Sequence, residues 1–269
     1  MRVLRVFPRK TNATPTDENV RFKQPGFFDE ADAVHVSCAF SCDLEHAERL
    51  VEAWETVAPT KLGGPATGQR GKEFTPGMYV KEGYTITSRG CPNKCWFCDV
   101  WKRDGSIREL EIKGGYNVLD DNLLACSEKH IRSVFKMLKR QKKRAQFTGG
   151  LEAARLKQWH VDLLVDLNPE QMFFAYDKED DYEPLVEAAR LMNDSGLMKQ
   201  RNARCYVLMG HKGDSVEAAN RRCEDALKLG YFPMGMLYID KRGKYNREFK
   251  KLQREWARPA IIYGKHKGD

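Results

Sequence analysis

The chain has 269 residues, of which 41% are hydrophobic, so it can bury the core of one large domain or of one domain with a small partner. No apolar run approaches the length of a membrane span, and the first ten residues are too short and too charged for a signal peptide. We therefore expect a cytoplasmic protein that does not contact a membrane. The formal charge of +8 is compatible with a polyanionic partner, but it can equally serve solubility.

Residues 1–80 are predicted to form a small α/β unit. Strands are expected at 1–7, 32–40 and 59–67. A helix is expected after Asp43, which can cap it, with an apolar stripe made of Leu44, Ala47, Leu50, Val51 and Trp54. Cys38 and Cys42 have CxxxC spacing. We expect buried thiols there, and the alternative is a second metal site.

Residues 81–240 alternate between strand and helix patterns, as in a parallel α/β sheet. Six core strands are expected, near 84–88, 114–122, 144–150, 171–177, 203–210 and 232–239. The segment 106–112 is expected to be a hairpin arm. Ser127 is predicted to cap a helix, which leaves His130 solvated in its first turn, and Cys223 falls on the inward face of a later helix.

Two segments are strongly basic, at 136–144 and from 241 onward. Residues 241–269 are predicted to form a basic, helical C-terminal segment, docked by Phe249, Leu252 and Trp256. A solvated helix face explains such charge runs as well as a phosphate-binding surface does.

The stretch 87–101 contains Cys91, Cys95 and Cys98, with three and then two residues between them. Clustered thiolates in a loop after a strand are typical of a soft-metal site. Three thiolates can hold three irons of a 4Fe–4S cluster and leave the fourth iron open to a ligand. The alternative is structural zinc, for which Cys126 or His130 would have to supply a fourth ligand.

This spacing, with the aromatic Phe97 directly before the last cysteine, resembles the signature of the radical S-adenosylmethionine (SAM) superfamily. The resemblance implies a 4Fe–4S cluster whose open iron binds SAM, and an electron donor of the flavodoxin or ferredoxin type. It implies reductive cleavage of SAM to a 5′-deoxyadenosyl radical, which abstracts hydrogen from a substrate. The implied fold is a (β/α)6 partial TIM-type barrel.

The N-terminal unit resembles a truncated form of the Rossmann-like domain that precedes the core in the cobalamin-associated branch of the superfamily. It is about half as long as expected for that domain, and it lacks the DxHxxG motif whose histidine ligates cobalt in many of them. We therefore expect no bound cobalamin.

The resemblance also assigns cofactor contacts, which should lie at the carboxyl ends of the strands. Phe97 is expected near the adenine, and Asp120, Asp121 or Asn122 stand where the family carries a motif for the methionine ammonium. Further SAM contacts are expected from Gly149, Gly150, Glu152, Arg155, Leu208, Gly210, Met236 and Leu237.

The motif does not specify the substrate. Charge and the two basic segments favour a nucleobase, free or in nucleic acid. A small metabolite or a peptide side chain is the alternative, and a zinc-stabilised nucleic-acid-binding module without catalysis is the competing class. The substrate-contacting candidates are Tyr176, Asp177, Arg201, Arg204, His211 and Tyr238.

Overall fold

The computed structural model describes residues 1–199, 202–258 and 262, so Arg201 and the segments 259–261 and 263–269 of the expected C-terminal helix lie outside the described residues. Two parallel sheets and one short antiparallel pair make up the fold, which confirms the α/β class. In the part of the chain that is described, no helix is both long and apolar enough to cross a membrane.

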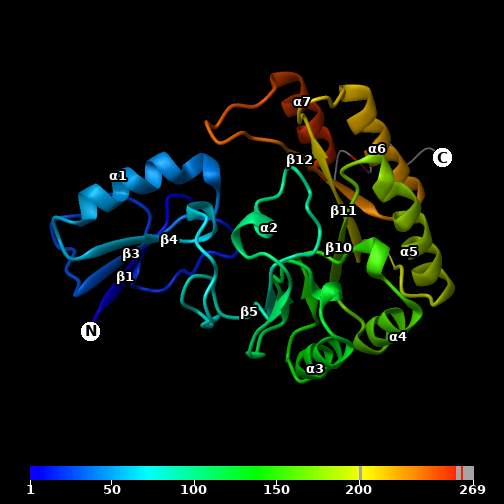
Figure 1. Cartoon of the computed structure of the whole chain (residues 1–269), viewed down its shortest axis with the longest axis horizontal. Coiled ribbons are helices and arrows are strands. Elements are labelled where there is room, and N and C mark those ends of the chain that lie inside the picture. Colours follow the sequence, from blue (N-terminus) through cyan, green and yellow to red (C-terminus); the bar gives the residue numbers. More distant parts are fainter. Residues whose placement is uncertain (200–201, 259–261, 263–269) are drawn as a thin grey trace.

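The N-terminal unit contains a four-stranded parallel sheet in the order β2-β1-β3-β4 (Figure 1). Its strands are β1 (Val3–Val6), β2 (Val20–Arg21), β3 (Ala33–Ser37) and β4 (Thr60–Gly63). Helix α1 (Leu44–Trp54) buries Ala47, Leu50 and Trp54 against the sheet, as its periodicity predicts. Asp43 does not cap this helix through its side chain, because its carboxylate instead accepts a hydrogen bond from Arg9 at 2.6 Å.

The larger unit contains a six-stranded parallel sheet in the order β12-β11-β10-β9-β8-β5, so its strands follow one another in chain order. They are β5 (Tyr84–Thr85), β8 (Asn117–Val118), β9 (Gln146–Phe147), β10 (Gln171–Ala175), β11 (Ala203–Met209) and β12 (Phe232–Leu237). β5 and β12 form the two edges, so the sheet is open. An antiparallel pair of β6 (Ser88–Arg89) and β7 (Arg108–Glu109) confirms the predicted hairpin arm.

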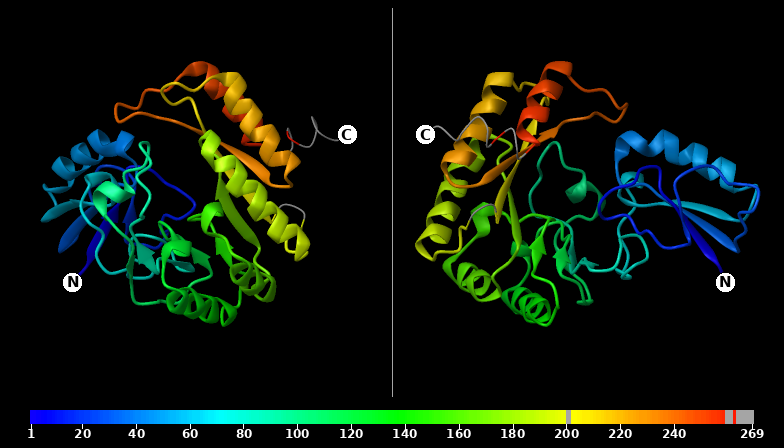
Figure 2. Two further views of the ribbon diagram at one scale, coloured as in Figure 1. Left: turned by 45° about the vertical axis from the view of Figure 1, so that its right-hand side comes forward. Right: turned by 180° about the vertical axis from the view of Figure 1, so that it is seen from behind.

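Helices α3 to α6 lie along one side of this sheet, away from the N-terminal unit (Figures 1 and 2). The helices are α2 (Val100–Arg103), α3 (Glu128–Lys139), α4 (Gln158–Leu167), α5 (Tyr182–Asp194), α6 (Val216–Lys228) and α7 (Arg247–Trp256). Among the described residues there are also short 3-10 turns, η1 (Ser41–Asp43) and η2 (Pro65–Thr67) in the N-terminal unit and η3 (Leu123–Ala125), η4 (Ala153–Arg155) and η5 (Glu179–Asp181) in the larger unit.

Several local predictions are confirmed. Ser127 caps α3 by accepting a hydrogen bond from the backbone of His130 at 3.2 Å. Cys223 is fully buried on the inner face of α6, and Phe249, Leu252 and Trp256 dock α7 on the core. Cys38 is buried as expected, but Cys42 is only partly buried and lies 3.9 Å from an Arg9 nitrogen.

Candidate functional site

The cysteine loop runs from Gly90 to Asp99, between β6 and α2, and both of its ends are fixed. Gly90 has a φ of +88°, and a Cβ there would lie 2.3 Å from the carbonyl oxygen of Ser106, so only glycine fits. The backbone N–H of Cys91 donates to the Gly105 carbonyl at 3.1 Å. The indole of Trp101 donates to the Cys95 carbonyl at 3.0 Å. The sulfurs are therefore presented by a loop with defined geometry.

The three loop thiols are partly exposed and form no disulfide. Burial raises the pKa of Cys95 and Cys98. Cys98 and Cys91 raise the pKa of Cys95 further, and Cys91 raises that of Cys98. The N–H of Val100 donates to the Cys98 sulfur and opposes the rise in its pKa.

The remaining cysteines of the large unit have a different environment. Cys126, Cys205 and Cys223 are buried, and burial raises the pKa of Cys126 to about 12. A thiol that resists deprotonation is a poor metal ligand. No three His, Cys, Asp or Glu side chains among the described residues converge on a point that could hold a single metal ion. In a 4Fe–4S cluster each thiolate binds a different iron, so its ligands need not converge in this way.

The three polar residues after β8 take different roles. Both carboxylate oxygens of Asp120 are occupied, one by the backbone N–H of Thr87 at 2.6 Å and the other by the hydroxyls of Thr87 and Ser88 at 2.6 and 2.8 Å. Asp120 thus holds the strand edge that leads into the cysteine loop. Burial raises the pKa of this carboxyl, and the donated hydrogen bonds oppose the rise.

Asp121 supports the start of the cysteine loop. Its carboxylate accepts a hydrogen bond from the N–H of Gly90 at 2.8 Å and lies 3.7 Å from Arg89 and 3.6 Å from Arg103. Burial raises its pKa, while the two arginines lower it. Like Asp120, it is engaged with neighbouring segments of the chain.

Asn122 is the member of this group that contacts a cysteine. Its side-chain amide donates to the Cys91 sulfur at 3.4 Å and to Glu152 at 2.6 Å. Its side-chain carbonyl oxygen is buried and has no hydrogen-bonding partner. A buried acceptor left open beside a thiol is a site for a donor from a ligand.

Glu152 joins three segments. It accepts hydrogen bonds from Asn93 in the cysteine loop at 2.9 Å, from Asn122 at 2.6 Å, and from the Nε of Arg155 at 2.6 Å. The two terminal nitrogens of Arg155 make no hydrogen bond to the described residues, and its side chain is 39% exposed. This guanidinium can therefore bind an anion.

The paired glycines before Glu152 serve the chain's own packing. A Cβ on Gly149 would lie 2.5 Å from the carbonyl oxygen of Asp120, so the absence of a side chain lets the third strand approach the end of the second. Gly150 has a φ of +100°, which favours glycine at the turn that follows β9.

The last strands contribute fewer open groups than the sequence predicts. The backbone of Leu208 is already engaged, because its N–H donates to Asp177 at 2.8 Å and its carbonyl accepts from Arg222 at 2.8 Å. The N–H of Gly210 donates to Asp214 at 2.9 Å. The exposed Met236 is paired in register with Leu208, so these two side chains share one face.

Leu237 corrects one expectation. It pairs in register with the fully buried Met209 and packs against the helix-side core, so it does not share the face of Met236. Successive residues of a strand point to opposite sides, and this alternation separates the two side chains that we expected to line one cofactor surface.

Aromatic rings connect the cysteine loop to the far strands. Trp96 is 52% exposed, and its ring contacts Phe97 at 5.4 Å, His211 at 5.2 Å and Tyr238 at 6.0 Å between centroids. His211 follows β11 and Tyr238 follows β12. With Asn122 after β8 and Glu152 after β9, these contacts place the loop over the carboxyl ends of the sheet.

Three further residues were placed incorrectly or missed. His130 is buried, contrary to the expected solvation, because its ring lies 3.3 Å from the Thr87 hydroxyl and 3.7 Å from Glu109. Asn93 and Trp96 were not singled out, although they stand inside the CxxxCxxC motif.

Two of the substrate-contacting candidates have other surroundings. Burial raises the pKa of Asp177 to about 6, and the Arg204 guanidinium lies over the Phe173 ring, 5.5 Å from its centroid.

No protein-family model matches the chain, and no curated protein shows significant sequence similarity to it. Its function must therefore be inferred from its own residues and their geometry.

Proposed function

We propose that this protein is a radical SAM enzyme with the architecture of a (β/α)6 partial barrel. The observation that carries the proposal is the position of the CxxxCxxC loop. Cys91, Asn93 and Trp96 contact residues that follow β8, β9, β11 and β12, so the loop lies where catalytic groups gather on parallel α/β folds. Six parallel strands in chain order support the partial barrel.

The donor set suits a 4Fe–4S cluster. Cys91, Cys95 and Cys98 would bind three irons, and they are the partly exposed thiols of this unit, whereas its other cysteines are buried. The N–H of Val100 and the amide of Asn122 donate to two of the sulfurs. Such hydrogen bonds stabilise thiolates and tune a bound cluster.

The surrounding residues provide complementary groups for SAM. The open carbonyl oxygen of Asn122 can accept a hydrogen bond from the methionine ammonium, and the free nitrogens of Arg155 can bind the carboxylate. Glu152 holds both residues in place. Phe97 and Met236 are proposed to flank the adenine. Asp120 and Asp121 act as supports of the loop, because their oxygens are already occupied.

The chemistry that the bound cluster supplies in this superfamily is one-electron reductive cleavage of SAM to methionine and a 5′-deoxyadenosyl radical, which abstracts a hydrogen atom. A flavodoxin or ferredoxin type of protein would provide the electron. We place the substrate next to Trp96, Tyr238 and His211, whose rings gather at the rim and can stack on a nucleobase. The basic segment 241–254 follows the same rim and carries exposed cations.

Anaerobic reconstitution with iron and sulfide tests this proposal. The wild type should turn brown, absorb broadly near ~400 nm and bind about four irons per chain. Cys91→Ala, Cys95→Ala and Cys98→Ala should each lose this spectrum, whereas Cys126→Ala should keep it. A colourless protein that binds one zinc, and loses it in Cys126→Ala, would support the zinc-binding module instead.

A further inference from the structure

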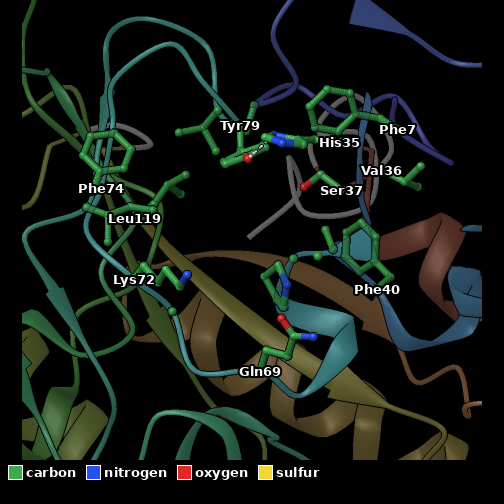
Figure 3. Close-up of a pocket in the computed structure, with 18 of the residues that line it drawn as sticks. Phe7, His35, Val36, Ser37, Phe40, Gln69, Lys72, Phe74, Tyr79 and Leu119 are labelled. Carbon is green, nitrogen blue, oxygen red and sulfur yellow. Dashed lines mark hydrogen bonds between the residues drawn. The ribbon is translucent and has the colours of Figure 1, made fainter. Parts of the chain in front are cut away.

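A second cavity lies between the four-stranded sheet and the large unit, and the site described above does not use it. Its volume is about 700 Å³, within the range of roughly 300–1,000 Å³ typical of small-molecule sites. Figure 3 shows Phe7, Val36 and Phe40 on the side of the small sheet, with Phe74 and Leu119 on the opposite side. Ser37, Gln69 and Lys72 lie between these walls.

The topology of the small sheet places this cavity where parallel sheets bind ligands. In the order β2-β1-β3-β4, the chain leaves β1 toward β2 on one side and leaves β3 toward β4 on the other. Connections that depart in opposite directions open a crevice at the carboxyl ends of the two strands. Residues 7–9, which follow β1, line the cavity together with Ser37, Ala39 and Phe40 at the end of β3.

The lining has a surplus of positive charge. Arg9 pairs with Asp43 at 2.6 Å, Arg103 pairs with Asp104 at 2.6 Å, and Arg89 lies 3.7 Å from Asp121. The other lining cations, Lys61, Arg70 and Lys72, have no ion-pair partner among the described residues. One lining acid, Glu73, is also unpaired, so three cations face one acid. This balance favours an anionic ligand.

The cavity also offers aromatic surface and a histidine nitrogen without a partner. Phe40 is 46% exposed and Tyr79 is 41% exposed, and the Arg9 guanidinium lies over one face of the Phe40 ring, 5.3 Å from its centroid. The Tyr79 hydroxyl lies 2.8 Å from His35 Nδ1. Burial raises the pKa of Tyr79, and burial together with Lys61 lowers the pKa of His35. Two neutral groups therefore share this hydrogen bond, and Nε2 of His35 is left without a partner among the described residues.

From these features we infer that the cavity binds a nucleoside phosphate. Lys61, Lys72 and Arg70 contact the phosphates, the rings of Phe40 and Tyr79 face the base, and Nε2 of His35 forms a hydrogen bond with the ligand. A nucleoside phosphate is flat at one end and anionic at the other. It therefore needs a cavity of this size with both aromatic walls and unpaired cations.

Fluorescence titration of the full chain with N-methylanthraniloyl-ADP tests this inference, and it does not depend on the iron–sulfur cluster. Unlabelled ADP should displace the probe, and adenosine should compete at least tenfold less well, because it lacks the phosphates. The double variant Lys61→Ala, Lys72→Ala should bind the probe at least tenfold more weakly. Phe40→Ala should also weaken binding several-fold.

Matched variants exclude general charge effects and misfolding. Lys142→Ala with Lys143→Ala makes the same change of charge on another surface, and Phe28→Ala removes a 90% exposed ring outside the cavity. Both should bind like the wild type. Equal binding by the Lys61, Lys72 variant and its control would overturn the inference, as would absence of probe binding by the wild type. Binding of hydroxocobalamin in place of ADP would also overturn it and would contradict the expectation of no cobalamin.

Discussion

The side-chain amide of Asn122 donates to the carboxylate of Glu152 at 2.6 Å, and this bond ties the segment after β8 to the segment after β9. Glu152 also accepts from Asn93, so the same carboxylate fixes the cysteine loop. Because Asn122 donates to the Cys91 sulfur as well, the bond connects the expected cluster ligand to the expected SAM contacts.

Glu152→Gln is therefore expected to loosen the cysteine loop. The Gln amide has one acceptor oxygen for the three donors that now bind the carboxylate, and its NH2 group would face donors in place of the second oxygen. Each hydrogen bond to a charged group contributes about 1.5–3 kcal/mol. Cluster iron should transfer to a chelator several-fold faster than in wild type. Glu187→Gln, which changes an exposed pair with Arg190, is the control. Equal release rates in the two variants would contradict the supporting role of Glu152.

Gly149→Ala should destabilise the protein, because the new Cβ would lie 2.5 Å from the Asp120 carbonyl oxygen. Overpacking of this kind costs about 1–3 kcal/mol. A thermal melt should show a lower Tm. Gly63→Ala is the matched control, since its Cβ would meet no atom within 4 Å and its φ is not in the left-handed region. A Tm for Gly149→Ala equal to that of Gly63→Ala would show that the two strands can separate without cost.

Asp177 should make stability depend on pH. Burial raises its pKa to about 6, above the ordinary 3.8, so the folded state holds a proton that the unfolded state releases. Stability should fall as pH rises from 3.8 to 6 and should then stay lower, by up to about 3 kcal/mol. Asp177→Asn keeps an acceptor for the Leu208 N–H and removes the charge, so it should raise Tm at pH 7.5.

The same comparison at low pH checks the cause. The gain from Asp177→Asn should shrink as pH falls from 6 toward 3.8, and Asp180→Asn, at an exposed carboxylate, should show no such pH-dependent gain. A gain in Tm that is independent of pH would mean that burial of the charge is not responsible.

If the substrate is nucleic acid, the basic segment 241–254 should supply the phosphate contacts. The alternative segment 136–144 is less suited, because Arg144 bonds to Asn168 and Pro169 just before β10, at the amino edge of the sheet. Fluorescence anisotropy at several salt concentrations should show a log–log slope of about −0.7 for each single-strand phosphate contact. Reversing Lys244, Arg247, Lys250 and Lys251 to Glu should reduce this slope.

The matched control reverses Lys136, Lys139, Arg140 and Lys142 and should leave the slope unchanged. SAM cleavage without substrate should be unaffected in both variants, because the reversed side chains make no hydrogen bond or ion pair with the described cysteine loop. Absence of binding at low salt, or an unchanged slope after reversal of the 241–254 cations, would indicate that these charges serve solubility and would favour a small-molecule substrate.

Much of the fold follows from local sequence patterns. The apolar stripe of α1, the capping of α3 by Ser127 and the burial of Cys223 depend on helical periodicity, which sequence displays directly. The short strand β2 was missed, because two residues in a polar segment show no alternation. Its pairing with β1 is a tertiary contact.

For the candidate site, the sequence predicts the cysteine motif but not the contacts around it. The cysteine spacing marks the loop, but the roles of Asp120, Asp121 and Asn122 depend on which side chain reaches which neighbouring strand. His130 was expected to be solvated because it begins a helix, yet the distant Thr87 gives it a buried partner. Alternation along β12 separates Met236 from Leu237, and a register fixed by pairing with β11 decides which of them packs on the core.

Cleavage of SAM by the reconstituted protein tests the central claim most directly. Wild-type protein, incubated anaerobically with SAM and dithionite, should form 5′-deoxyadenosine and methionine, measured by liquid chromatography with mass detection. Cys91→Ala, Cys95→Ala and Cys98→Ala should form neither product above the level without enzyme, whereas Cys223→Ala should retain activity. Wild-type protein that holds a full complement of iron and sulfide yet forms no 5′-deoxyadenosine would contradict the assignment as a radical SAM enzyme.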